Sequence, residues 1–198
     1  MTTTKRGHFT QASAVEVSPD KTVAVVNLDA LAPIGKARDI TVVGKGSSEL
    51  EDLLQPILAK QQRTIAGESN TAAGYYFRSD HFNFAKAGVP ALYLDSGNDL
   101  LEGGAAAGEA AGKDYTDNRY HKAGDDYDAT AWKLDGIMQD LEVAYSVGEA
   151  LANGGQWPNW YEGDEFRAIR DQSCASAPTP GIATRTCSFR KSISESLK

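Results

Sequence analysis

Three short, mostly apolar runs constrain the fold of this 198-residue chain more than any other feature. Residues 21–28, 39–43 and 91–94 have the length of strands, and the last follows directly on Pro90. Such nearly continuous apolar runs are typical of strands buried on both faces of a parallel or mixed sheet. Helical patterns lie between and after them. The alternation predicts an α/β protein with a mixed, mostly parallel sheet flanked by helices.

One helix is predicted after the second strand. It would begin at a cap residue, Ser47 or Ser48, and Pro56 should kink or shorten it. Its apolar residues fall on one helical face: Leu50, Leu53, Leu54, Ile57 and Leu58.

Apolar periodicity and turn residues also predict the helices and loops in the rest of the chain. Residues 80–87 indicate a short helix closed by Gly88, and a long amphipathic helix follows Asp128 and ends at Asn153-Gly154-Gly155. An aromatic-anchored segment with a helix to about Asp171 comes last. Residues 97–117 are rich in Gly and Ala and lack periodicity, which predicts a loop.

Both ends of the chain differ in composition from the middle. We expect residues 1–20 to be an atypical N-terminal segment, 21–173 to form the folded part, and 174–198 to be a disordered tail. The tail has four Lys or Arg against one Glu and contains Cys174 and Cys187, which could pair.

Charge and hydropathy exclude two kinds of partner. The net charge is -7 and no basic stripe is present, which argues against nucleic-acid binding. No apolar run reaches membrane-spanning length. No apolar stretch follows Met1–Gly7, so no signal peptide is expected and the localisation stays open.

Two residues stand where a metal ligand could lie. Asp29 follows a buried strand directly, and ligand sites in open α/β sheets gather at the carboxyl ends of strands. His121 lies in a polar loop, with Asp125 four residues later as a partner that could orient its ring. Taken singly, a turn carboxylate, an exposed histidine and a helix-capping Asp125 explain these residues equally well.

A third segment, Arg78-Ser79-Asp80-His81, precedes a short helix and a Gly-Val-Pro strand entry. Taken alone, the segment indicates a helix N-terminus with Ser79 or Asp80 as its cap. Together with Asn27-Leu28-Asp29 and Tyr120-His121, however, this segment resembles the second half of the zinc aminopeptidase family, which includes glutamate carboxypeptidases and glutaminyl cyclases. The order and spacing match from Lys21 to Asp171.

The resemblance implies a fold and a site. The fold would be the phosphorylase/hydrolase-like zinc exopeptidase type, and the substrate a peptide cleaved at its N-terminal residue. Asp29 would bind one of two zinc ions and His121 the other. Tyr120 and Arg78 would stabilise the oxyanion formed when zinc-bound water attacks the carbonyl.

The family pattern is incomplete in this chain. Only 28 residues precede Asp29, and they contain neither the His-X-Asp nor the Glu-Glu pair that supplies the remaining ligands and the base. We therefore expect the C-terminal part of a catalytic domain that, as given, neither retains two zinc ions nor cleaves amino-acid anilides. The absent part would leave an apolar sheet edge through which copies could self-associate.

Two other functions stay open. One is a non-catalytic α/β interaction module that has lost its metal site. The other is a glutaminyl cyclase or carboxypeptidase relative, since these enzymes share the second-half motifs.

Overall fold

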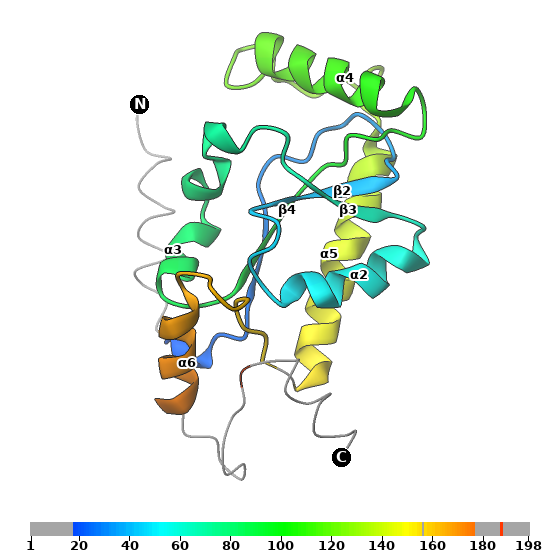
Figure 1. Ribbon diagram of the computed structural model, residues 1–198. Coiled ribbons are helices and arrows are strands. Elements are labelled where there is room, and N and C mark those ends of the chain that lie inside the picture. The colour runs from blue at the N-terminus through cyan, green and yellow to red at the C-terminus, as the bar shows by residue number, and fades with distance from the viewer. Residues whose placement is uncertain (1–17, 156, 177–186, 188–198) are drawn as a thin grey trace.

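The computed structural model describes residues 18–155, 157–176 and 187, and Figure 1 shows their arrangement. The elements in chain order are η1 (Pro19–Lys21), β1 (Val25–Leu28), β2 (Asp39–Val43), α2 (Leu50–Lys60), β3 (Thr64–Gly67), η2 (Thr71–Ala73), η3 (Tyr75–Arg78), α3 (His81–Lys86), β4 (Ala91–Asp95), α4 (Gly104–Asn118), α5 (Leu134–Gly154) and α6 (Arg167–Ser176). The predicted N-terminal segment, except residues 18–20, lies outside the described residues, and so does most of the predicted tail.

The strands form a four-stranded sheet in the order β1-β4-β2-β3. β1 runs parallel to β4 and β2 parallel to β3, while β2 and β4 are antiparallel. The predicted mixed, mostly parallel α/β sheet is confirmed. β1 lies at one edge of it, and self-association through this edge stays a prediction.

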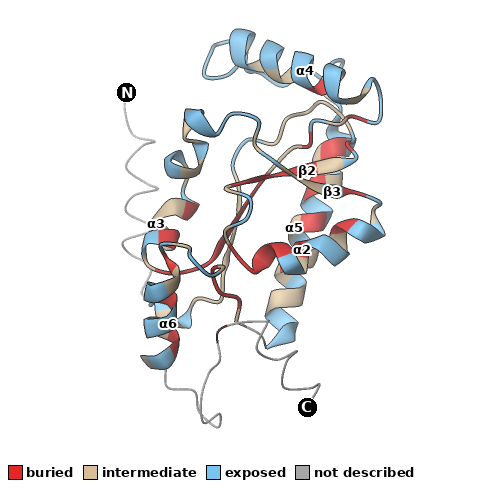
Figure 2. Cartoon of the chain, viewed as in Figure 1, coloured by how far each residue is buried: buried red, intermediate tan, exposed pale blue. Residues whose placement is uncertain are grey.

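One face of the sheet is covered by α2 and α5. Alternate residues of β2 and β4 point to this face, which is the period-2 arrangement of strands. Figure 2 shows the buried stretches of β2, α2 and α5 facing one another. The fully buried members of this cluster are Ile40, Val42, Leu50, Leu54, Leu58, Leu92, Leu94, Val143 and Val147.

The other face is covered by α3 and by the segment around Trp160. Trp160 is fully buried, and its indole nitrogen donates to the Gly88 carbonyl at 3.0 Å. Ala85, Ala91 and Phe166 pack in the same cluster. The aromatic segment predicted to anchor the C-terminal part of the chain therefore packs against the sheet.

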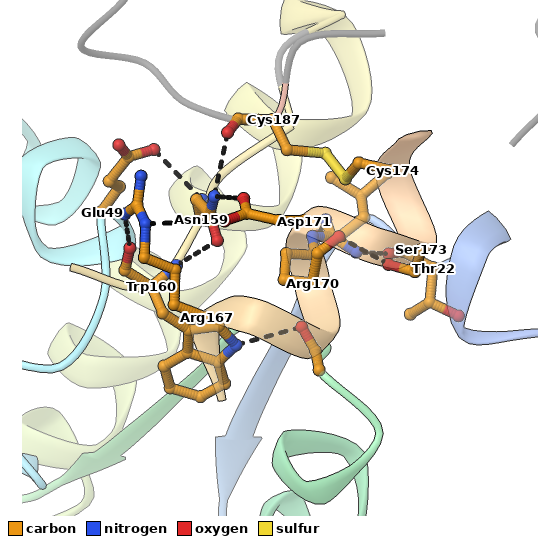
Figure 3. The surroundings of a disulfide bond; sticks show 12 residues. Thr22, Glu49, Asn159, Trp160, Arg167, Arg170, Asp171, Ser173, Cys174 and Cys187 are labelled. Carbon is orange, nitrogen blue, oxygen red and sulfur yellow. Dashed lines mark hydrogen bonds and ion pairs between the residues drawn. A yellow bond between two sulfur atoms is a disulfide. The ribbon is translucent and has the colours of Figure 1, made fainter. Parts of the chain in front are cut away.

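Asn159 holds the C-terminal segment in place (Figure 3). Its side chain donates to Asp171 at 2.8 Å and to the Cys187 carbonyl at 3.0 Å. Cys174 and Cys187 are joined by a disulfide bond. The boundary predicted at residue 173 thus falls inside α6, where Cys174 is buried.

The loop predicted at 97–117 is wrong, because residues 104–118 form α4. Alanine is the strongest helix former, and this helix is rich in it. Only Gly108 of α4 is buried, so the helix has no apolar stripe that a periodicity criterion could detect.

The start of α2 also differs from the prediction. The N-cap position is Glu49, and no side chain caps the helix there. The Glu51 carboxylate accepts instead from the backbone N–H groups of Gly46 and Ser47, at 2.6 and 3.1 Å. The helix continues through Pro56 to Lys60. Among the described residues, no helix has the length and apolar character needed to cross a membrane.

Candidate functional site

Two carboxylates lie at the carboxyl ends of neighbouring parallel strands, Asp29 just after β1 and Asp95 at the end of β4. The register pairs Leu28 of β1 with Leu94 of β4, so Asp29 comes next to Asp95. The pKa of Asp95 is raised to about 6, mainly by burial; the Ser96 amide hydrogen bond opposes this, and the charges of Asp140 and Asp29 add to it. Carboxyl ends of strands are where ligand sites of open α/β sheets lie. Asp95 was not predicted, although it ends the buried strand β4. The expectation that the strand before Asp29 is buried on both faces is wrong, because β1 is an edge strand and all its residues are half-buried.

The Asp29 carboxylate is held by a chain of hydrogen bonds. The Ser79 hydroxyl donates to Asp29 Oδ2 at 2.9 Å, and Asn27 Nδ2 donates to the Ser79 hydroxyl at 2.9 Å. Asp80 occupies the N-cap position of α3, in line with the prediction, but its side chain makes no capping hydrogen bond there. Ser79 instead fixes the orientation of the candidate ligand.

His81, two residues after Ser79, is fully buried, and its ring packs against two tyrosine rings. Its ring centroid is 4.7 Å from that of Tyr76 and 4.8 Å from that of Tyr93. Burial lowers the pKa of His81 to about 4, against the opposing effects of Asp29 and Asp80. Neither ring nitrogen has a hydrogen-bond partner among the described residues. His81 is therefore a neutral aromatic member of the core at neutral pH.

Tyr120 and His121 follow α4 on an exposed turn. Their rings stack with centroids 4.0 Å apart, and His121 has a left-handed backbone with φ of 59°. Asp125, the residue expected to orient His121, accepts a hydrogen bond from the Tyr115 hydroxyl at 3.0 Å. The part of the chain that the structure describes therefore gives Asp125 a different role from the predicted one.

The ionisation of Tyr93 is influenced both by the carboxylates at the ends of β1 and β4 and by Tyr120. Its pKa is raised to about 12, first by burial and then by the charges of Asp29 and Asp95, with a smaller contribution from Tyr120. Asp29 and Tyr120 thus both lie within electrostatic reach of one phenol. Arg78 is exposed at the end of η3, one residue before Ser79. That Asp29 and His121 share one site stays a prediction.

The described residues do not complete a zinc site. Over residues 18–155, 157–176 and 187, no group of three or more His, Cys, Asp or Glu side chains is arranged to hold a metal ion. Zinc sites in proteins use three or four protein ligands. Asp29 and His121 alone do not fit the ion, so further ligands would have to come from elsewhere.

Fold and site together define an α/β protein with carboxylates at the carboxyl edge of a mixed sheet, the class to which zinc exopeptidases belong. The model of peptidase family M28 matches residues 7–146, so the chain belongs to that family. The family is one of metallopeptidases and typically binds zinc. No curated protein and no solved structure matches the chain.

Proposed function

We propose that this chain contributes one side of a dizinc aminopeptidase centre, which removes N-terminal residues from peptides. The observation that carries the proposal is the fixed Asp29 carboxylate at the carboxyl end of β1, held by Ser79 at 2.9 Å. Membership of a metallopeptidase family supports the reaction class.

In this proposal Asp29 and His121 serve as ligands of different zinc ions. The Tyr120 hydroxyl and the Arg78 guanidinium stabilise the oxyanion of the tetrahedral intermediate. Both side chains are exposed, as groups that reach a substrate must be. The remaining ligands and the base come from residues outside the described part or from another polypeptide.

The experiment measures zinc and hydrolysis together. The purified chain is assayed by elemental analysis and with leucine anilide, alone and joined to the first half of another M28 catalytic domain. We expect substoichiometric zinc and background hydrolysis for the chain alone, and gain of both in the joined protein. Asp29→Ala and His121→Ala should abolish the gain, whereas Asp117→Ala, on exposed α4, should leave it intact.

Either of two results would contradict the proposal. Stoichiometric zinc in the isolated chain, lost on Asp29→Ala, would show that a complete site exists without added residues. A folded joined protein that gains neither zinc nor activity would favour the second candidate, a non-catalytic interaction module. The specific observation in favour of that candidate is the lack of a three-ligand cluster among the described residues.

A further inference from the structure

The long helix α5 carries apolar residues on two opposite sides. On the side toward the sheet, Val143 and Val147 are fully buried in the core cluster. On the outward side, exposed apolar residues recur at alternating steps of four and three: Leu134, Met138, Leu141 and Tyr145, with exposed fractions of 44%, 56%, 40% and 70%. A surface helix normally carries polar residues on that side. The exposed apolar stripe therefore indicates an interaction surface.

The stripe has the spacing of a coiled-coil seam. Its steps continue beyond Tyr145 to Gly148 and to the exposed Ala152. A Cβ added at Gly148 would have nothing within 4 Å, so this position is also open to the outside. Residues 134, 138, 141, 145, 148 and 152 are called the α5 seam below. At about 1.5 Å per residue the seam is about 27 Å long, enough to bind a partner helix of about five turns.

A groove of about 480 Å³ lies between the middle of the α5 seam and α2. Met138, Leu141 and Tyr145 line it from α5, and Ile57 lines it from α2. When two helices pack, side chains of one insert into holes of this kind on the other. The residues that line the groove include none of the candidate metallopeptidase residues.

A row of acidic residues runs along one flank of the α5 seam. Asp135, Glu142 and Glu149 recur every seven residues, each directly after a seam position. Gln61 Nε2 donates to Glu142 Oε2 at 3.5 Å, which places the row on the α2 side of the seam. Of the described residues that line the groove there, only Lys60 is basic. The carboxylates outnumber this positive charge, so the flank is negatively charged.

The acidic row decides between two kinds of partner helix. In an antiparallel pair of two α5 helices, the acidic rows of the two copies would face each other. Like charges at such flanking positions are destabilising, so a second copy of this chain fits the seam poorly. A helix with Lys or Arg at its flanking positions would instead form opposite-charge pairs with the row.

We propose that the α5 seam and the groove beside it bind a basic amphipathic α-helix of another polypeptide. Large apolar residues of the partner pack against the seam and insert into the groove. Lys or Arg side chains along one flank of the partner pair with the acidic row. The inference uses none of the candidate ligands and does not rest on the proposed function.

The experiment titrates the full chain into two fluorescein-labelled peptides of about 21 residues, long enough to cover the seam as helices, and follows fluorescence anisotropy. Both peptides have Leu at the seam positions of a heptad repeat. One has Lys at the flanking positions and the other has Glu. We expect saturable binding of the Lys peptide and about tenfold weaker binding of the Glu peptide, because opposite-charge pairs become like-charge pairs. A Lys peptide of the same composition in scrambled order should lose the saturable binding, because it has no apolar seam.

A charge placed in the seam tests where the helix binds. Tyr145→Glu should abolish binding of the Lys peptide, because Tyr145 lies in the middle of the seam and is 70% exposed. If this variant fails to fold, Met138→Glu provides the same test. Ala110→Glu, at an exposed position of α4, is the matched control and should leave binding intact.

Reversing the charge of the acidic row tests what selects the partner. Glu142→Lys/Glu149→Lys should reverse the preference, so that the Glu peptide binds more tightly than the Lys peptide. Glu109→Lys/Asp117→Lys, on the exposed side of α4, makes the same change in net charge and should keep the original preference.

Three results would overturn the proposal. The first is no saturable binding of the Lys peptide to the folded chain, whether the seam is empty or covered by another part of the chain. The second is a preference that the reversal of the acidic row leaves unchanged. The third is a dimer of the chain alone, measured by light scattering and dissociated by Tyr145→Glu, which would assign the seam to a second copy.

Discussion

Replacing His81 by Phe should change how stability depends on pH. His81 is fully buried, and its pKa is lowered from 6.5 to about 4, chiefly by burial. Above pH 6.5 the imidazole is neutral in both folded and unfolded chains, so its contribution to stability is fully present. As the pH falls from about 6.5 to 4, the unfolded chain takes up a proton that the folded protein does not. Stability is therefore lost on acidification in this window.

The magnitude follows from the pKa values. Each unit of pKa difference corresponds to about 1.4 kcal/mol, so the lowering from 6.5 to about 4 is worth about 3 kcal/mol. Phe keeps a ring between Tyr76 and Tyr93 but has no proton to bind. The free energy of unfolding of His81→Phe relative to the wild type should thus rise by about 3 kcal/mol between pH 7 and pH 4.

Urea unfolding followed by circular dichroism at several pH values measures this difference. His121→Gln is the matched control, because His121 is exposed on a turn, and its stability should follow that of the wild type. The reasoning is refuted if the difference between His81→Phe and the wild type stays constant from pH 7 to pH 4.

Three further changes have defined outcomes. Burial raises the pKa of Asp95 from 3.8 to about 6, so the folded protein loses stability as the pH rises through this window. Asp95→Asn should therefore raise the free energy of unfolding at pH 7, measured with urea, by about 2 kcal/mol after a discount for solvent screening. An unchanged free energy of unfolding would count against this reasoning. The disulfide bond joins Cys174 and Cys187, which are 13 residues apart. Its removal, by Cys→Ser substitution or by a reductant, should lower the free energy of unfolding by about 3 kcal/mol and lower the Tm. An unchanged Tm would exclude a structural role for the bond. Gly108→Ala should lower the Tm because the added methyl would meet the Asn98 carbonyl in the loop after β4. Gly112→Ala, with open space around it, should instead stabilise α4 by about 0.5–1 kcal/mol. Equal Tm values for the two variants would refute the close approach of α4 to this loop.

The sequence predicted the elements whose buried residues form an apolar run or an apolar helical face. β2, β4 and the long helix α5 have continuous or periodic apolar residues because the sheet and the helices bury each other. β3 was missed because Thr64–Gly67 is only half-buried and pairs along an edge, which leaves no apolar run. Elements of this kind are set by tertiary pairing and not by local pattern.

The position of Asp29 directly after a strand could be predicted from the sequence, whereas its role as a metal ligand stays a prediction. The bond from Ser79 to Asp29 joins residues 50 positions apart, and the local alternative of a helix cap was the simpler interpretation. The sequence did not predict that His81 would be buried, because the tyrosines that cover it, Tyr76 and Tyr93, come from two other segments of the chain.

The most direct test of the account is whether Asp29 and His121 lie in one site. The double variant Asp29→Cys/His121→Cys, treated with a short bifunctional thiol reagent, should form an intramolecular cross-link, identified by peptide mass spectrometry. Asp29→Cys/Tyr145→Cys is the control, because Tyr145 is 70% exposed on α5. The account predicts rapid cross-linking of the first pair and none of the second. Equal, negligible cross-linking of both pairs in folded protein would contradict the shared metallopeptidase site.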